Sequence, residues 1–153
     1  HGRYQDQVKA QGFMPYMKPF YDLLEKYRGK MIYLDFWAPW CPPCLAEMEP
    51  LKELRKKYKT EDIVFITICR GDNRKRLKEV LEKYEMHVDG IEHILTDDLQ
   101  DDNNVHKMYN QLNVNRFPHY FIINREGVIV NYGSMVRPSY PGTAACIEQW
   151  LGK

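Results

Sequence analysis

The sequence lacks a strong net charge, a long apolar run and a rich set of cysteines. Its 22 basic and 21 acidic side chains leave a formal net charge of +1, so no overall field draws the chain to nucleic acid or to an anionic membrane. The longest apolar run covers residues 63–69, far short of the ~18 residues that predict a transmembrane helix. Four cysteines with one close pair are too few for a disulfide-stapled mini-protein or for two zinc-binding CxxC hooks. We therefore expect a soluble domain whose partners must be inferred from local sites.

Length and composition predict one folded domain. The chain has 153 residues, of which 44% are hydrophobic and 28% charged, as expected for a packed core under a solvated surface. Residues 1–14 have no clear period, so we expect an irregular lead-in before a domain over residues 15–153. The chain opens at His1 with neither an initiator Met nor an apolar leader. We therefore expect that a signal peptide or membrane anchor preceded His1 and was cut off from this chain.

Alternating strand and helix patterns predict an α/β fold. Apolar, β-favouring runs predict buried strands, and a turn at residues 124–127 joins the last two of them. The predicted strands cover residues 31–37, 63–68, 91–95, 120–123 and 128–132. Helical spacing of apolar residues predicts helices over residues 19–29, 44–58, 73–84, 105–112 and 140–151. This order requires a mixed central sheet with parallel crossovers, one antiparallel hairpin and helices on both faces. Pro50 predicts a kink in the second helix.

The close cysteine pair stands at the expected start of a helix. Cys41-Pro42-Pro43-Cys44 follows soon after the predicted strand at residues 31–37. A helix N-terminus has unpaired N–H groups and the positive end of the helix dipole, which favour a thiolate at Cys41. Cys44 lies almost one helical turn further on the same face, where it can attack a mixed disulfide formed through Cys41. We therefore assign Cys41 as the nucleophile and Cys44 as the resolving thiol.

A structural disulfide or half of a zinc site is the alternative for an isolated CxxC. A second CxxC is absent, and no internal histidine falls at a recognised zinc-ligand spacing from the pair. The acidic residues at 97–98 and 101–102 lack the spacing of a calcium loop, so we expect a solvated turn there. Basic residues at 70–76 predict a solvated surface. The sequence thus predicts no metal site and no nucleic-acid partner.

Residues 34–44, which read Leu-Asp-Phe-Trp-Ala-Pro-Trp-Cys-Pro-Pro-Cys, closely resemble the active-site segment of thioredoxins. Phe117-Pro118 resembles the cis-proline loop of that family. Glu47 and Pro50 after the motif, together with an insertion between residues 69 and 95, resemble the TlpA and ResA branch of periplasmic thioredoxin-like proteins. The resemblance spans roughly residues 20–151.

The resemblance implies a thioredoxin fold and a thiol-disulfide oxidoreductase that needs no cofactor and exchanges disulfides with protein substrates, in the reducing direction. It also implies a monomer in an extracytoplasmic compartment, served by an upstream membrane electron donor. The Pro42-Pro43 dipeptide departs from the Gly-Pro usual in thioredoxins. The direction of electron flow therefore stays open at this point.

The resemblance also assigns roles to four residues outside the cysteine pair. Trp40 is expected to flank the nucleophile. Pro118 is expected in cis across from Cys41, where its loop and Phe117 pair with an extended substrate segment. Asp35 resembles the buried acid of thioredoxins, whose raised pKa suits proton exchange with the resolving cysteine.

Other functions use related folds and stay open as alternatives. A thiol peroxidase also depends on a cysteine of low pKa, although it does not normally use a CxxC pair after a Trp. A copper-binding assembly factor usually has three residues between its cysteines rather than two. A non-catalytic redox or interaction domain of a larger lipoprotein is the last alternative. Cys69 and Cys146 have no role in the family pattern, and we expect them to pack in the interior.

Overall fold

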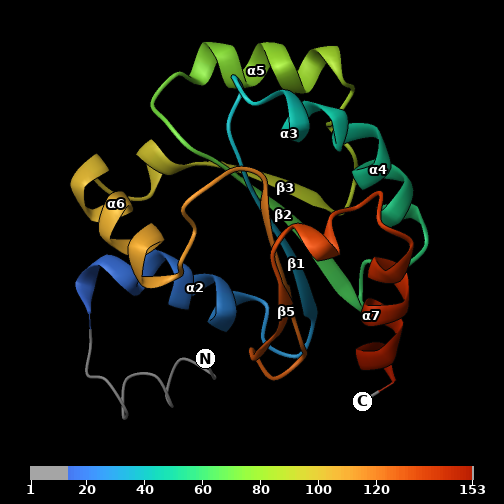
Figure 1. Cartoon of the computed structure of the whole chain (residues 1–153). Helices are drawn as coiled ribbons and strands as arrows, with labels where there is room; N and C mark the ends of the chain where they lie inside the picture. The colour runs from blue at the N-terminus through green and yellow to red at the C-terminus, as the bar shows by residue number, and fades with distance from the viewer. Residues whose placement is uncertain (1–13, 153) are drawn as a thin grey trace.

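The computed structural model describes residues 14–152, so most of the expected lead-in, residues 1–13, lies outside the described part, as does residue 153. A five-stranded sheet of order β3-β2-β1-β4-β5 forms the centre of the domain (Figure 1). Its strands are β1 (Met31–Trp37), β2 (Ile63–Cys69), β3 (Ile91–Leu95), β4 (His119–Ile123) and β5 (Ile129–Tyr132). β1, β2 and β3 are parallel, and β4 pairs antiparallel with both β1 and β5. The predicted mixed sheet with one antiparallel hairpin is confirmed.

β1 occupies the middle of the sheet because both of its faces are suited to burial. All seven of its residues are buried, and an apolar run of this kind is typical of a parallel strand covered on both sides. Side chains alternate between the faces, so Tyr33, Asp35 and Trp37 share one face while Leu34 and Phe36 share the other. The strand delivers the chain directly to the cysteine pair.

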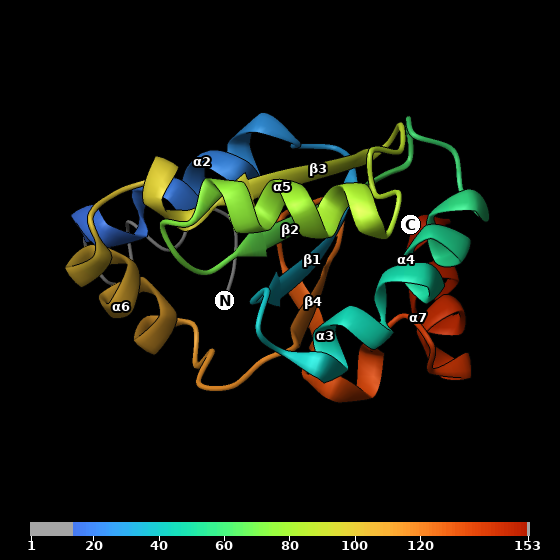
Figure 2. The same cartoon turned by 90° about the horizontal axis from the view of Figure 1, so that it is seen from above.

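Helices cover both faces of this sheet (Figure 2). One face is covered by α2 and α6, and the other by α3, α4, α5 and α7. The helices are α2 (Lys18–Lys26), α3 (Pro42–Ala46), α4 (Met48–Lys56), α5 (Arg74–Lys83), α6 (Asp102–Gln111) and α7 (Pro141–Leu151). Three short 3-10 turns, η1 (Pro15–Met17), η2 (Thr96–Asp98) and η3 (Ser134–Val136), complete the fold.

The sheet faces carry different side chains. The α2–α6 face is apolar, with Leu34, Phe36 and Phe121 packed against residues of the two helices. The opposite α4–α5–α7 face combines apolar packing with the buried carboxyl of Asp35 and the buried hydroxyl of Thr67. The buried polar side chains of Asp35 and Thr67 therefore lie on the same side of the sheet.

The helix predicted over residues 44–58 is interrupted one turn earlier than expected. Two helices, α3 and α4, meet at Glu47. Pro50 has no N–H to donate to the carbonyl of Ala46, and its ring clashes with that carbonyl. The helix therefore breaks between Ala46 and Met48, and Pro50 itself lies in the first turn of α4, where a missing N–H costs least.

Candidate active site

The cysteine pair lies where β1 ends and α3 begins, at one end of the sheet. Cys41 is the N-cap residue of α3 and Cys44 lies within its first turn. A disulfide joins their sulfur atoms, and their Cα atoms are 5.3 Å apart. Cys41 is 8% and Cys44 3% exposed. The structure is therefore that of the oxidised protein, with Cys41 the more exposed of the two residues.

The backbone around Cys41 presents one N–H group to its sulfur. Pro42 and Pro43 occupy the first two helical positions and carry no N–H. The first available donor is the N–H of Cys44, which points at Cys41 Sγ at 3.3 Å. The next, the N–H of Leu45, closes the helix by donating to the Cys41 carbonyl. An N–H aimed at sulfur from a helix N-terminus favours the thiolate of Cys41 once the disulfide is reduced.

Asp35 lies on β1, on the sheet face that α3 covers. Its side chain is buried, and Oδ1 has no hydrogen-bond partner among residues 14–152. Burial, with the nearby negative charge of Glu47 second, raises the pKa of the Asp35 carboxyl from 3.8 to about 8. A carboxyl with that pKa holds a proton at neutral pH and exchanges it readily. These properties suit the expected proton shuttle.

Glu47 is a member of the site to which sequence reasoning gave no role. Its half-buried carboxylate lies at the junction of α3 and α4, where it accepts hydrogen bonds from the backbone N–H of Ser139 at 2.8 Å and the Ser139 hydroxyl at 2.7 Å. These bonds tie the end of α3 to the loop that follows η3. The signal in the sequence was its spacing, because a residue three positions after Cys44 lies one helical turn further along.

Trp40, Phe117 and Pro118 are the residues at which substrate docking is expected. The Phe117–Pro118 peptide bond is cis, the isomer implied by the resemblance to thioredoxins. Phe117 is half-buried and packs against the cores on both faces of the sheet. Trp40, directly before the nucleophile, is 67% exposed. A large aromatic side chain left in solvent beside a reactive sulfur is suited to contact a partner.

Comparison with known proteins identifies the family. The Redoxin family model matches residues 20–146, which is most of the chain. The chain belongs to the Redoxin family. Among curated proteins, the thiol-disulfide oxidoreductase ResA of Geobacillus kaustophilus (strain HTA426) is 29% identical over 106 residues, covering 69% of this chain and 55% of that protein. The Redoxin chain therefore spans about half the length of the curated relatives it matches.

Solved structures agree with this assignment. A protein of Bacteroides vulgatus, solved in solution and assigned as a thiol-disulfide oxidoreductase, is 32% identical with a TM-score of 0.66, and the match covers 84% of this chain and 78% of that one. The crystal structure of the thioredoxin domain of another Bacteroides vulgatus thiol-disulfide oxidoreductase has a TM-score of 0.67 at 18% identity, with 84% of each chain covered. The predicted thioredoxin fold and the resemblance to ResA-type proteins are both confirmed.

The other two cysteines of this Redoxin chain are not joined in a disulfide. Cys69 ends β2 and is buried, and its S–H points at the Arg70 carbonyl at 3.9 Å. Burial, followed by the charge of Asp35, raises the pKa of the Cys69 thiol to about 12. Cys146 is half-buried on α7 and accepts a hydrogen bond from Asn131 at 3.5 Å. Both cysteines therefore pack in the domain, as expected.

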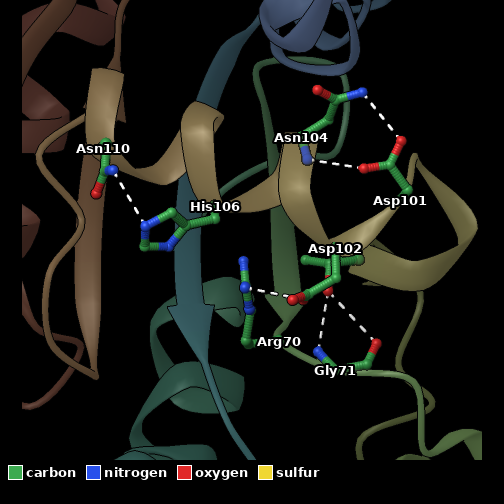
Figure 3. Close-up of polar contacts among 8 residues, drawn as sticks. Arg70, Gly71, Asp101, Asp102, Asn104, His106 and Asn110 are labelled. Carbon is green, nitrogen blue, oxygen red and sulfur yellow. Dashed lines mark hydrogen bonds and ion pairs between the residues drawn. The ribbon is translucent and has the colours of Figure 1, made fainter.

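The acidic turn before α6 and the basic residues after β2 hold each other in place. Figure 3 shows Asp101 capping α6 by accepting the backbone N–H of Asn104 at 2.9 Å, while Arg70 pairs with Asp102 at 2.9 Å. Among residues 14–152, no group of three or more His, Cys, Asp and Glu side chains is arranged to hold a metal ion. Within the same range no helix has the length and apolarity needed to cross a membrane. The ion pairs of this surface are Arg70–Asp102, Arg74–Asp98 and Arg76–Glu79.

Proposed function

We propose that this Redoxin-family domain is a thiol-disulfide oxidoreductase that reduces disulfides of protein substrates through Cys41 and Cys44. The observation that carries the proposal is the N-cap position of Cys41, whose sulfur accepts the N–H of Cys44 at the start of α3. That arrangement favours a thiolate. The names of the ResA relatives and of the Bacteroides vulgatus protein support the same activity.

The reaction balances in two steps. In the reduced protein the Cys41 thiolate attacks one sulfur of a substrate disulfide, and the other substrate sulfur leaves as a thiolate that takes a proton from water. Cys44 then gives its proton to Asp35 in its ionised form and attacks Cys41 Sγ, which breaks the mixed disulfide, and the second substrate sulfur leaves as a thiolate that takes a proton from water. The substrate leaves as a dithiol with two electrons, and the protein ends in the Cys41–Cys44 disulfide seen in the structure. An upstream dithiol donor must then restore the two electrons.

Substrate docking is proposed at the surface formed by Trp40, Phe117 and Pro118. The exposed Trp40 ring offers apolar contact area. The segment after a cis Pro118 is the start of β4. An extended substrate segment lying beside Pro118 gains backbone hydrogen bonds while its sulfur approaches Cys41.

An extracytoplasmic location, membrane attachment through a segment outside this chain, a membrane electron donor and a monomeric state belong to the same proposal. They are supported by the resemblance of the motif and its flanks to the TlpA and ResA branch. Fractionation of cells that express the full-length protein tests the location, and mass measurement in solution tests the oligomeric state.

Trapping tests the activity. Cys44→Ser removes the resolving thiol, so mixed disulfides between Cys41 and substrates are expected to accumulate, whereas Cys41→Ser traps none. Multiple turnover by Cys44→Ser without added thiol would contradict the mechanism. Peroxide consumption at a rate that exceeds disulfide reduction would favour a thiol peroxidase instead. Wild-type biological activity in both variants would favour a non-catalytic interaction domain.

The direction of electron flow is tested by the reduction potential of the Cys41/Cys44 couple against glutathione. Known members of this fold lie between about -270 mV for thioredoxin and about -120 mV for DsbA. A reductase is expected near the lower value. A value near the upper one would mean an oxidant or isomerase with the same two cysteines in the same roles.

A further inference from the structure

Four polar side chains form a row across the sheet on the α4–α5–α7 face. In the strand register, Asp35 of β1 lies opposite Tyr120 of β4 on one side and Thr67 of β2 on the other. Thr67 in turn lies opposite His93 of β3. Residues directly opposite each other on paired strands share a face. The row therefore leads from the buried carboxyl of the active site to the edge strand β3.

The outer half of this row is hydrogen-bonded. Thr67 is fully buried, and its hydroxyl lies 2.6 Å from His93 Nδ1. His93 Nε2 lies 2.8 Å from the Met86 carbonyl. A carbonyl only accepts, so Nε2 carries the hydrogen and the neutral ring leaves Nδ1 as an acceptor. The Thr67 hydroxyl therefore donates to His93 and keeps its lone pairs for a donor on the other side.

Asp35 is the polar neighbour on that other side. Adjacent strands lie about 4.8 Å apart, and Asp35 Oδ1 has no partner among the described residues. A protonated Asp35 can therefore turn to donate to Thr67. When its proton passes to the Thr67 oxygen and the hydroxyl hydrogen passes to His93 Nδ1, Asp35 becomes a carboxylate and His93 an imidazolium. The net result is the transfer of one proton from Asp35 on β1 to His93 on β3. The Thr67 hydroxyl then donates to the Asp35 carboxylate.

The far end of the row reaches solvent. His93 is half-buried on the edge strand β3 and lines an open cavity of about 460 Å³ beside α5. The His87 ring lies 6.3 Å from the His93 ring, centroid to centroid, and Arg74 and Lys78 of α5 line the same cavity. The negative charge of the neighbouring Glu92 raises the pKa of His93, whereas the His87 ring lowers it. Burial, as the largest cause, lowers the pKa of His93, in line with the neutral ring that the two hydrogen bonds indicate.

We propose that Thr67 and His93 are positioning residues that take up the proton of Asp35 and leave its carboxylate ready for the Cys44 proton during resolution of the mixed disulfide. This inference rests on the proposed disulfide exchange. It assigns to the edge strand β3, far from the cysteine pair along the chain, a part in the second chemical step. The first step, attack by Cys41, needs no proton from Asp35 and stays unchanged.

The test separates the two steps in the full chain. Thr67→Val keeps the shape of the side chain without the hydroxyl, and His93→Gln keeps a donor for the Met86 carbonyl without a titrating ring. Both are expected to slow release of substrate from the mixed disulfide roughly tenfold at pH 7, with attack by Cys41 unchanged. Thr67→Ser restores the hydroxyl and the rate. His106→Gln, at an exposed histidine of α6, is the matched control.

A second readout does not depend on turnover. In the reduced protein, the ¹³C carboxyl titration of Asp35 is expected to move to higher pH in Thr67→Val, because the carboxylate loses a donor, and to return in Thr67→Ser. Equality of Thr67→Val and His93→Gln with the His106→Gln control in both release rate and titration would overturn the relay. Failure of the wild-type protein to form mixed disulfides at all would overturn the proposed function instead.

Discussion

Cys41 lies just beyond the end of β1 and Cys69 ends the neighbouring strand β2, yet their surroundings give them opposite chemistry. Trp37, the last residue of β1, lies opposite Cys69, the last residue of β2, and both cysteines are buried. Cys41 Sγ faces the N–H of Cys44, whereas Cys69 Sγ faces a backbone carbonyl. An N–H stabilises a thiolate and a carbonyl disfavours it. Burial raises the pKa of the Cys69 thiol, whereas at Cys41 the start of α3 supplies an N–H that favours the thiolate despite burial.

The largest expected difference is in the rate of disulfide reduction between Cys41→Ser and Cys69→Ser. Cys41→Ser removes the nucleophile and is expected to lower disulfide reduction by at least about 10³-fold. Cys69→Ser leaves the pair intact, so its rate is expected to stay within about twofold of wild type. Insulin reduction with each variant measures both rates. Equal losses in the two variants would remove the distinction between the two cysteines.

Asp35→Asn is expected to have the next largest effect, on the second thiol of the pair. Without a carboxylate to accept the Cys44 proton, release of substrate slows by about 10- to 100-fold at pH 7. The wild-type release rate rises as pH passes through about 8, the pKa of Asp35, and this rise is lost in the variant. Stopped-flow release from a preformed mixed disulfide measures the profile, and an unchanged profile would exclude Asp35 as the shuttle.

The same substitution changes how stability depends on pH. The pKa of Asp35 is higher in the folded protein than the 3.8 of an exposed carboxyl, so the folded protein binds a proton that the unfolded chain releases. Wild-type stability should therefore fall between pH 4 and 8, by up to about 1.4 kcal/mol per pH unit from this group. Asp35→Asn should flatten that slope and be the more stable protein at pH 8. Urea unfolding at several pH values measures both curves.

Glu47→Gln is expected to have a smaller effect, on the pKa of the Asp35 carboxyl. The amide keeps an acceptor for the Ser139 N–H but removes the charge that contributes to the raised pKa of Asp35. The Asp35 titration is expected to fall by less than about one unit, and the rise in release rate moves with it. Carbon NMR of the reduced variant measures the shift. A titration that moves upward would mean that Glu47 stabilises the carboxylate by another route.

The smallest effects are expected at the cysteines outside the motif. Cys69→Ala deletes one buried sulfur and is expected to cost about 1 to 2 kcal/mol of unfolding free energy. Cys146→Ala, at a half-buried position, is expected to cost less than about 1 kcal/mol. Thermal and urea unfolding measure both costs. A loss of exchange activity in either variant would show that the reactive set extends beyond Cys41 and Cys44.

Much of the fold follows from local patterns in the sequence. The buried strand at residues 31–37 and the edge strand at 91–95 are found at the predicted bounds, because side-chain period and β-branched residues decide them locally. The sequence predicted a kink at Pro50, but the helix breaks one turn earlier, at Glu47. The reason is that the proline ring clashes with the carbonyl four residues before it. Periodicity locates elements better than their ends.

The site was only partly predictable for a physical reason. The cysteine pair, Asp35 and the cis proline are carried by contiguous motifs, and the structure gives Asp35 the burial expected for it. The Glu47–Ser139 contact and the Thr67–His93 hydrogen bond join residues 92 and 26 positions apart. Such contacts depend on strand order and register, which the spacing within one segment does not specify.

Thiolate titration of the reduced protein shows whether Cys41 is the activated cysteine. Alkylation by iodoacetamide, followed at each cysteine by mass spectrometry across pH 4 to 11, separates the four sulfurs. Cys41 is expected to react with a midpoint below about pH 7.5, whereas Cys69 is expected to stay unmodified until above pH 10 because of its raised pKa. A Cys41 midpoint at or above the ordinary thiol value of about 8.5 would contradict the claim that the start of α3 activates this cysteine.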